Sequence, residues 1–79
     1  MNWVSVLDKL PAMDIEDGDF KSSQKVIAFF RNGSEYWCES VTLKLYYEDG
    51  EEPEWYFDYD GERVMGNKIT HWTPLILPN

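Results

Sequence analysis

Apolar and polar residues alternate through the middle of the chain, and this pattern predicts β-strands. From Val41 to Tyr47 every second residue is apolar or aromatic, which places Leu43 and Leu45 on one face and Lys44 on the other. Residues 54–59 repeat the pattern. We therefore expect a hairpin with one buried side and one acidic side, in which the rings on the buried side join the core: Trp55, Phe57 and Tyr59.

Turn signals divide the rest of the second half into further strands. The apolar run Lys25 to Phe30 is followed by Asn32-Gly33, which predicts a two-residue hairpin turn with both central residues at positive φ and a strand returning at Tyr36. Asp60-Gly61 predicts another turn. A last short strand is expected over Ile69 to Trp72, before Pro74 ends regular structure.

The first part of the chain, from Trp3 to Ser23, shows weak periodicity. Pro11 would lie inside any helix drawn through Leu7 and Leu10, where it removes a hydrogen bond and clashes with the preceding turn. We expect a short helical or irregular cover there. The predicted fold is mainly β, or small α+β, with a single antiparallel sheet of four to five strands in one domain over residues 1–79.

The charge balance narrows the choice of partner. Fifteen Asp and Glu residues against seven Lys and Arg give a net charge of −8, which disfavours direct binding to nucleic acid or to an anionic membrane and favours a basic partner. The amino terminus lacks the pattern of a signal peptide, and no apolar run is long enough to span a bilayer. Plain solubility is the alternative explanation of the acidity.

Eight carboxylates without one Lys or Arg occupy the segment from Glu48 to Glu62. Tyr46 and Tyr56 are expected on the outer faces beside them, where amphipathic rings suit an interface. A second cluster, Asp14 to Asp19, is a candidate extension of this surface. The predicted partner-binding residues are Tyr46, Glu48, Asp49, Glu51, Glu52, Glu54, Tyr56, Asp58, Asp60 and Glu62.

Catalysis and metal binding have weaker support. Cys38 and His71 are a conceivable nucleophile and base, but no third residue to orient them is indicated. Carboxylates near Gly18 and Gly61 offer oxygen ligands for calcium, without the spacing of a helix-loop-helix calcium loop. A small metal-dependent hydrolase is therefore a third hypothesis. We predict no enzyme activity, catalytic residue, metal or cofactor.

The two ends of the chain resemble a family of short phage and prophage proteins of unknown function. Residues 3–11 read W-V-S-V-L-D-K-L-P, and the family opens with W-[IV]-S-V-x-[DE]-[KR]-L-P; residues 69–75 read I-T-H-W-T-P-L, against a family ending of [IV]-T-H-W-M-P-L-P. Thr73 replaces the usual Met, and Ile76 the usual Pro. The resemblance implies a phage origin and a location in the cytoplasm of a bacterial host. We expect both ends to be scaffold, with Trp3 and Trp72 closing opposite ends of one core.

Charge and resemblance together give the functional hypothesis. Small acidic phage proteins resemble accessory factors that block host nucleic-acid-binding complexes. We therefore predict an inhibitor of the anti-CRISPR or anti-restriction type, with a DNA-mimic-like acidic surface that binds a basic host protein or nucleoprotein complex. The acids from Glu48 to Glu54 and from Asp58 to Glu62 are expected side by side. The alternative is an interaction or assembly module, such as a homodimer, whose acidity only serves solubility.

Overall fold

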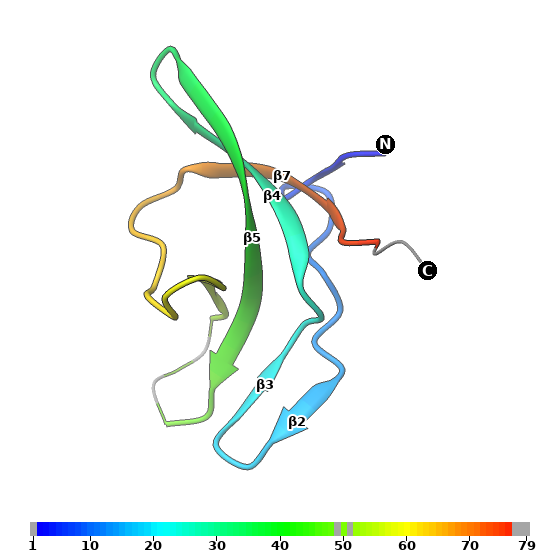
Figure 1. Cartoon of the computed structure of the whole chain (residues 1–79). Helices are drawn as coiled ribbons and strands as arrows, with labels where there is room; N and C mark the ends of the chain where they lie inside the picture. The colour runs from blue at the N-terminus through cyan, green and yellow to red at the C-terminus, as the bar shows by residue number, and fades with distance from the viewer. Residues whose placement is uncertain (1, 49, 51, 77–79) are drawn as a thin grey trace.

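The fold of the described residues is all-β (Figure 1). The computed structural model describes residues 2–48, 50 and 52–76 of the chain. Seven antiparallel strands form one curled sheet, a half-barrel, and no helix occurs in these residues. The strands are β1 Val4–Ser5, β2 Ile15–Asp17, β3 Phe20–Ser22, β4 Val26–Asn32, β5 Glu35–Tyr46, β6 Glu54–Phe57 and β7 Ile69–Pro74.

The antiparallel sheet confirms the main prediction, but the strand count was wrong. The N-terminal cover is irregular and not helical, which is one of the two forms expected. The additional strands β1, β2 and β3 have two or three residues each and come from the part of the chain with weak periodicity. Strands this short contain too few residues to show an alternating pattern. The N-terminal segment that contains Pro11 has no regular structure between β1 and β2.

The long strand β5 organises the sheet. Val41 pairs with Val26 of β4 and with Phe57 of β6, so these two strands lie on opposite edges of β5. Lys44 pairs with Ser22 of β3 and again with β6, so β3 and β4 share one edge. Between Ser22 and Val26 that edge has one residue more than β5 has between Lys44 and Val41. This β-bulge lets the chain bend from β3 into β4.

The hairpin between β4 and β5 forms as predicted, with a different turn. Asn32 pairs with Glu35, so the two central residues are Gly33 and Ser34. Gly33 has a φ of 65°, and no residue other than glycine has a positive φ among those described. One glycine at the first central position is typical of a type II′ turn. The expected turn with two positive φ angles was therefore wrong, and β5 begins one residue before Tyr36.

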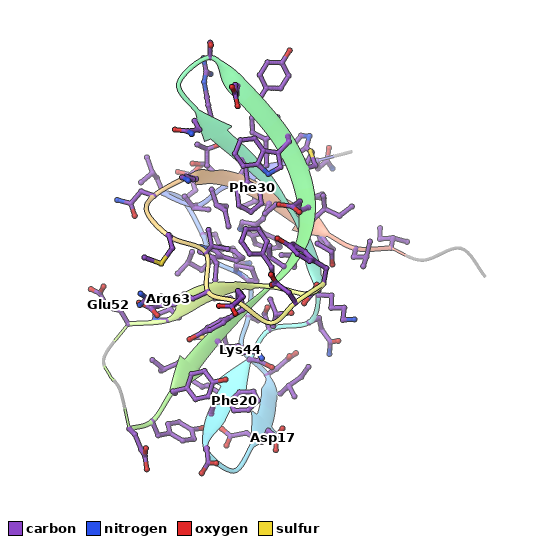
Figure 2. All side chains as sticks on the ribbon, turned by 60° about the vertical axis from the view of Figure 1, so that its left-hand side comes forward. Asp17, Phe20, Phe30, Lys44, Glu52 and Arg63 are labelled. Atoms are coloured by element: carbon purple, nitrogen blue, oxygen red, sulfur yellow. The ribbon has the colours of Figure 1, made fainter. Side chains whose placement is uncertain are left out.

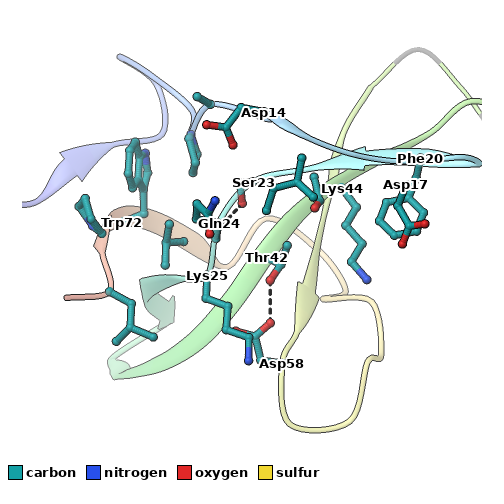
Figure 3. Close-up of a pocket in the computed structure, with 17 residues that line it drawn as sticks. Asp14, Asp17, Phe20, Ser23, Gln24, Lys25, Thr42, Lys44, Asp58 and Trp72 are labelled. Atoms are coloured by element: carbon teal, nitrogen blue, oxygen red, sulfur yellow. Dashed lines mark hydrogen bonds between the residues drawn. The ribbon is translucent and has the colours of Figure 1, made fainter. Parts of the chain in front are cut away.

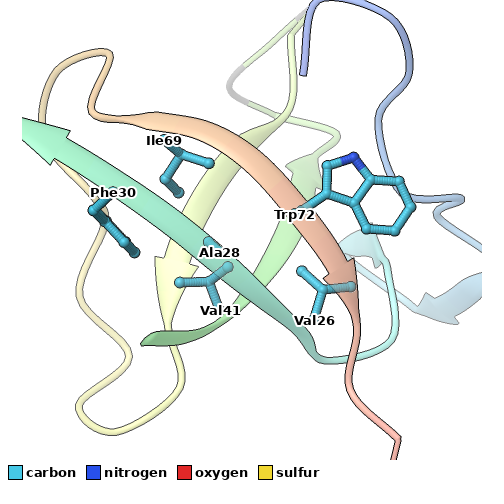
Figure 4. Packing of buried hydrophobic residues seen from close by; sticks show 6 residues of the cluster. All are labelled: Val26, Ala28, Phe30, Val41, Ile69 and Trp72. Atoms are coloured by element: carbon cyan, nitrogen blue, oxygen red, sulfur yellow. The ribbon is translucent and has the colours of Figure 1, made fainter. Parts of the chain in front are cut away.

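The core lies on the inner face of the curled sheet (Figure 4). Phe30 is completely buried, and its ring stacks on Trp37 at 5.2 Å and on Phe57 at 5.5 Å between centroids. The indole Nε1 of Trp72 donates a hydrogen bond to the carbonyl oxygen of Lys9 at 2.8 Å, which ties the N-terminal segment to the core. The buried cluster consists of Val26, Ala28, Phe30, Val41, Ile69 and Trp72.

Two aromatic residues expected in the core lie elsewhere. Trp55 and Phe57 pack against the core, but Tyr59 is 71% exposed because β6 ends at Phe57 and a turn closes with the Gly61 amide donating to the Phe57 carbonyl. Trp3 does not close the core either. It is 39% exposed and packs against Phe29 on the outer face of the sheet.

The two ends of the chain that resemble phage proteins pair with each other. Val4 of β1 lies opposite Trp72 of β7, and Ser5 lies opposite His71. The amide of Val6 extends the ladder by donating to the carbonyl of Thr70 at 3.0 Å. These segments therefore build one side of the sheet together, as expected for scaffold.

Candidate functional site

The predicted acidic surface is divided, and part of it is internally neutralised. Glu54 at the start of β6 accepts hydrogen bonds from Arg63 at 3.1 Å and forms an ion pair with it. Both side chains are about half exposed, so this pair is a surface salt bridge, a kind of interaction that contributes little to stability. Glu54 presents little free negative charge to a partner.

Asp58 lies on the outer face of the sheet, where its carboxylate is bonded to β5. Its half-buried carboxylate accepts a hydrogen bond from the hydroxyl of Thr42 at 2.7 Å and a short one from Ser40. Its amide also donates to the Ser40 carbonyl at 3.2 Å, which continues the pairing of β6 with β5. Asp58 therefore lies on the face opposite to that of Phe57, but its carboxylate fixes a turn to β5 and so offers less free charge to a partner.

The remaining described acids of the segment are exposed, but they lie in three places. Glu48 follows the far end of β5, whereas the turn that contains Asp60 and Glu62 lies beside Ser40. The six residue steps from Ser40 to Tyr46 span about 20 Å along a strand. Among the described residues, Glu48 is therefore not beside the 58–62 turn, contrary to the expected pairing of 48–54 with 58–62. Glu52 is exposed beside β6, and Asp49 and Glu51 lie outside the described residues.

A different acidic segment joins Glu48, and Tyr47 holds it there. The Tyr47 amide donates to the carbonyl of Asp19 at 3.0 Å, and its hydroxyl donates to the two carboxylate oxygens of Glu16 at 3.0 and 2.9 Å. The β2–β3 hairpin is thus fixed to the end of β5, opposite the β4–β5 hairpin (Figure 2). We call the four exposed acids gathered here the acidic end: Glu16, Asp17, Asp19 and Glu48.

Tyr46 and Tyr56 form part of a half-buried aromatic cluster next to the acidic end. Their rings meet edge to face at 5.9 Å, and Phe20 lies 5.0 Å from Tyr46. The ammonium of Lys44 sits over Phe20 at 5.0 Å and over Tyr56 at 5.4 Å. Each such cation–π contact contributes about 0.5–2 kcal/mol. The rings of Phe20 and Tyr56 therefore hold a lysine, which places a positive charge among the tyrosines expected to bind a partner.

A groove of about 810 Å³ lies beside the bulge between β3 and β4 (Figure 3). Its walls carry both signs of charge, with Lys25 and Lys44 facing a lining that includes Asp14, Asp17 and Asp58. Because its charges are mixed, this groove is not a continuation of the negatively charged acidic end. The strongest negative charge therefore lies at the tip of the β2–β3 hairpin and at Glu48.

Sequence reasoning missed an aromatic surface on the outer face of the sheet. Phe29 is its centre: Trp3 lies 5.9 Å away, Tyr36 stacks at 6.0 Å, and His71 contacts it edge-on at 6.4 Å. Tyr36 is 70% exposed. Alternation along β4 was the available signal, because Phe29 must point away from the core if Phe30 points into it. We call these four residues the aromatic face.

The geometry does not support the nucleophile and base considered from the sequence. Phe29 pairs with Cys38 on one side and with His71 on the other. Cys38 and His71 are therefore two strand spacings, or about 10 Å, apart. The His71 Nδ1 lies 2.9 Å from the Thr70 hydroxyl instead. Within residues 2–48, 50 and 52–76, no three Asp, Glu, His or Cys side chains are grouped so that they could hold a metal ion. No helix of membrane-spanning length and apolarity occurs there either.

The Tyr47–Glu16 contact makes the acidic end sensitive to alkaline pH. The hydrogen bond to Glu16 raises the pKa of Tyr47 above its ordinary value of 10.0, with smaller contributions from burial and from the negative charge of Glu16. A raised pKa means that the folded state favours the neutral phenol. The contribution of this contact is therefore complete below pH 10 and is lost as the pH rises through the raised pKa.

We expect the replacement Tyr47→Phe to remove a tyrosine that ionises late. The measurement is the absorbance of tyrosinate during an alkaline titration of the wild-type protein and the variant. The difference between the two curves should have its midpoint above pH 10. A midpoint at or below pH 10 would show that the hydroxyl does not bind Glu16 in solution.

Comparisons with protein families, with curated proteins and with solved structures found no match to this chain. The resemblance of its two ends to phage proteins stays a prediction. What the fold and the site define is a class: a small all-β domain with an acidic end and an aromatic outer face.

Proposed function

We propose that this protein is a non-enzymatic inhibitor whose acidic end occupies a basic, nucleic-acid-binding surface of a host protein, in the manner of anti-CRISPR or anti-restriction proteins. The observation that carries the proposal is the attachment of the β2–β3 hairpin to the end of β5. The Tyr47 amide binds Asp19 and the Tyr47 hydroxyl binds Glu16. These contacts bring the acids of two distant segments together.

The charge of the whole chain supports a basic partner. A net charge of −8 attracts a positively charged surface over a distance and raises the rate of encounter, an effect that weakens as salt is added. The same charge repels nucleic acid, so the protein would compete with DNA or RNA for a site instead of binding it.

The arrangement of the acidic end also reduces a geometric obstacle to mimicry. Acids on one face of a single strand recur only every ~6.6 Å, whereas one DNA strand carries a phosphate every ~3.4 Å along its axis. Neighbouring strands lie ~4.8 Å apart. Glu16 and Asp17 on β2, with Asp19 in the turn to β3 and Glu48 after β5, therefore provide charges across strands as well as along them.

Capture from a bacterial lysate on the immobilised protein tests the proposal. At low salt the column should retain basic nucleic-acid-binding proteins, and duplex DNA added to the buffer should elute them because both compete for one surface. The proposal fails if no such protein is retained, or if the retained proteins resist elution by DNA. An interaction that persists at high salt would favour a module whose acidity serves only solubility.

A further inference from the structure

We propose that the aromatic face is the contact surface of a symmetric homodimer, in which a second copy of this chain packs against it. This inference does not rest on the function proposed for the acidic end, which lies at the opposite end of the sheet from the β4–β5 hairpin. It follows from the exposure, the charge and the symmetry of the outer face.

The outer face has the composition of a covered surface. An antiparallel sheet that buries one face normally carries polar side chains on the other. Here Tyr36 and Trp3 are 70% and 39% exposed, with Phe29 half-buried between them. Exposed Cys38 lies opposite Phe29 in the register. Aromatic side chains in a continuous patch are typical of the centre of a protein interface.

The charge pattern favours a second copy as the occupant. Strand register places ten described residues on this part of the outer face, and the carboxylate that reaches them is that of Asp58, bonded to Ser40. None of the ten is itself acidic: Trp3, Ser5, Ile27, Phe29, Arg31, Tyr36, Cys38, Ser40, His71 and Thr73. Two copies with a net charge of −8 repel each other wherever carboxylates face carboxylates. Across this face that repulsion is reduced, because the strand residues contribute no carboxylate and the Asp58 carboxylate lies on the same face as the positive charge of Arg31.

The patch is also complementary to itself. Consider a two-fold axis that lies in the plane of the interface and runs above the Phe29–Cys38 pair, across the strands. This axis places β5 antiparallel over β5 of the second copy. Arg31 stands one row, ~6.6 Å, from that axis, and Ser40 stands one row away in the other direction. Asp58 is hydrogen-bonded to Ser40, so each Arg31 would approach the Asp58 of the other copy. A two-fold interface requires such reciprocal contacts.

The size of the patch limits how tightly two copies can bind. Four strands at ~4.8 Å and about five residues at ~3.3 Å cover roughly 14 by 16 Å. This is smaller than the ~800 Å² that each partner buries in a standard interface. We therefore expect a dissociation constant in the micromolar range or weaker, so the measurement needs protein concentrations up to about 1 mM.

Sedimentation equilibrium of three proteins tests the dimer: the wild type, Tyr36→Ala and Tyr59→Ala. Tyr59 is 71% exposed against 70% for Tyr36 but lies outside the aromatic face, so the two changes remove equally exposed rings. The Tyr36 change should weaken the dimer about tenfold or more, and the Tyr59 change should leave it within about twofold. A wild-type protein that stays monomeric throughout, or equal effects of both changes, overturns the proposal.

The single cysteine supplies a second measurement. Packed sheets lie ~10 Å apart, so a short bismaleimide should link the Cys38 residues of two copies near the axis. The link should form in the wild type and in Tyr59→Ala, and much less in Tyr36→Ala. Reversing the charges of the acidic end should not weaken the dimer, which separates this proposal from the proposed function. Loss of the dimer on charge reversal, or no link in the wild type, contradicts the proposed interface.

Discussion

Replacing Phe30 with alanine should lower the free energy of unfolding by about 3–5 kcal/mol, the range measured for buried Phe-to-Ala changes. The side chain is completely buried between Trp37 and Phe57, so its removal leaves a cavity in the centre of a thin core. A chain of 79 residues has about 4–12 kcal/mol of stability in total. The variant should therefore lose a large share of its stability.

Phe29→Ala is the matched control, because the two phenylalanines are adjacent in β4 and point to opposite faces. Its effect on the free energy of unfolding should be about 1 kcal/mol. Urea denaturation followed by tryptophan fluorescence compares both variants with the wild type. If the two substitutions lower the free energy of unfolding equally, the assignment of inner and outer faces is wrong.

Charge reversal at the acidic end should weaken binding to a basic partner about a hundredfold at low salt. The change is Asp17→Lys with Asp19→Lys and Glu48→Lys; these side chains are exposed, so the fold should persist. Loss of about 1 kcal/mol per reversed contact gives a total of about 3 kcal/mol. The measurement is the amount of basic protein retained from the same lysate at each salt concentration.

The control for charge reversal is a second triple, Asp8→Lys with Glu35→Lys and Glu62→Lys. Three reversals of two charges each bring either protein from −8 to −2, so only the position of the change differs. The control should retain most of the binding. Equal losses in the two triples would show that the partner senses net charge, and a larger loss in the control would move the site away from the acidic end.

The sequence predicted the part of the fold in which strands are long. Alternation in β5 and the signal at Asn32-Gly33 identify the central hairpin, because several residues contribute to each pattern. The two- and three-residue strands β1, β2 and β3 have no such pattern. They are strands because their neighbours pair with them, and pairing between distant segments cannot be recognised from one of them alone.

The acidic surface shows the same limit. Eight carboxylates lie together in the sequence, but Asp58 turns to Ser40 and Thr42, and Glu54 pairs with Arg63. The partner of Glu48 is instead a hairpin about thirty residues earlier, which Tyr47 attaches through Glu16. Proximity in sequence therefore overstated how much of the segment forms one surface. Similarly, Phe29 and Phe30 are equal in hydrophobicity, and only the register separates a half-buried ring on the outer face from a buried one in the core.

The pairing of β1 with β7 determines when the fold can be completed. Ile69–Pro74 provides the partner strand for β1 and also for one edge of β4, and it leaves the ribosome after all the other strands. Until then β1 has no neighbour, the Trp72 ring is missing from the core, and one edge of β4 is unpaired. Contacts between segments this far apart form slowly because a long loop must close first. Folding should therefore finish only once β7 has been made, and a nascent chain stopped before residue 69 should expose its apolar inner face to chaperones and proteases.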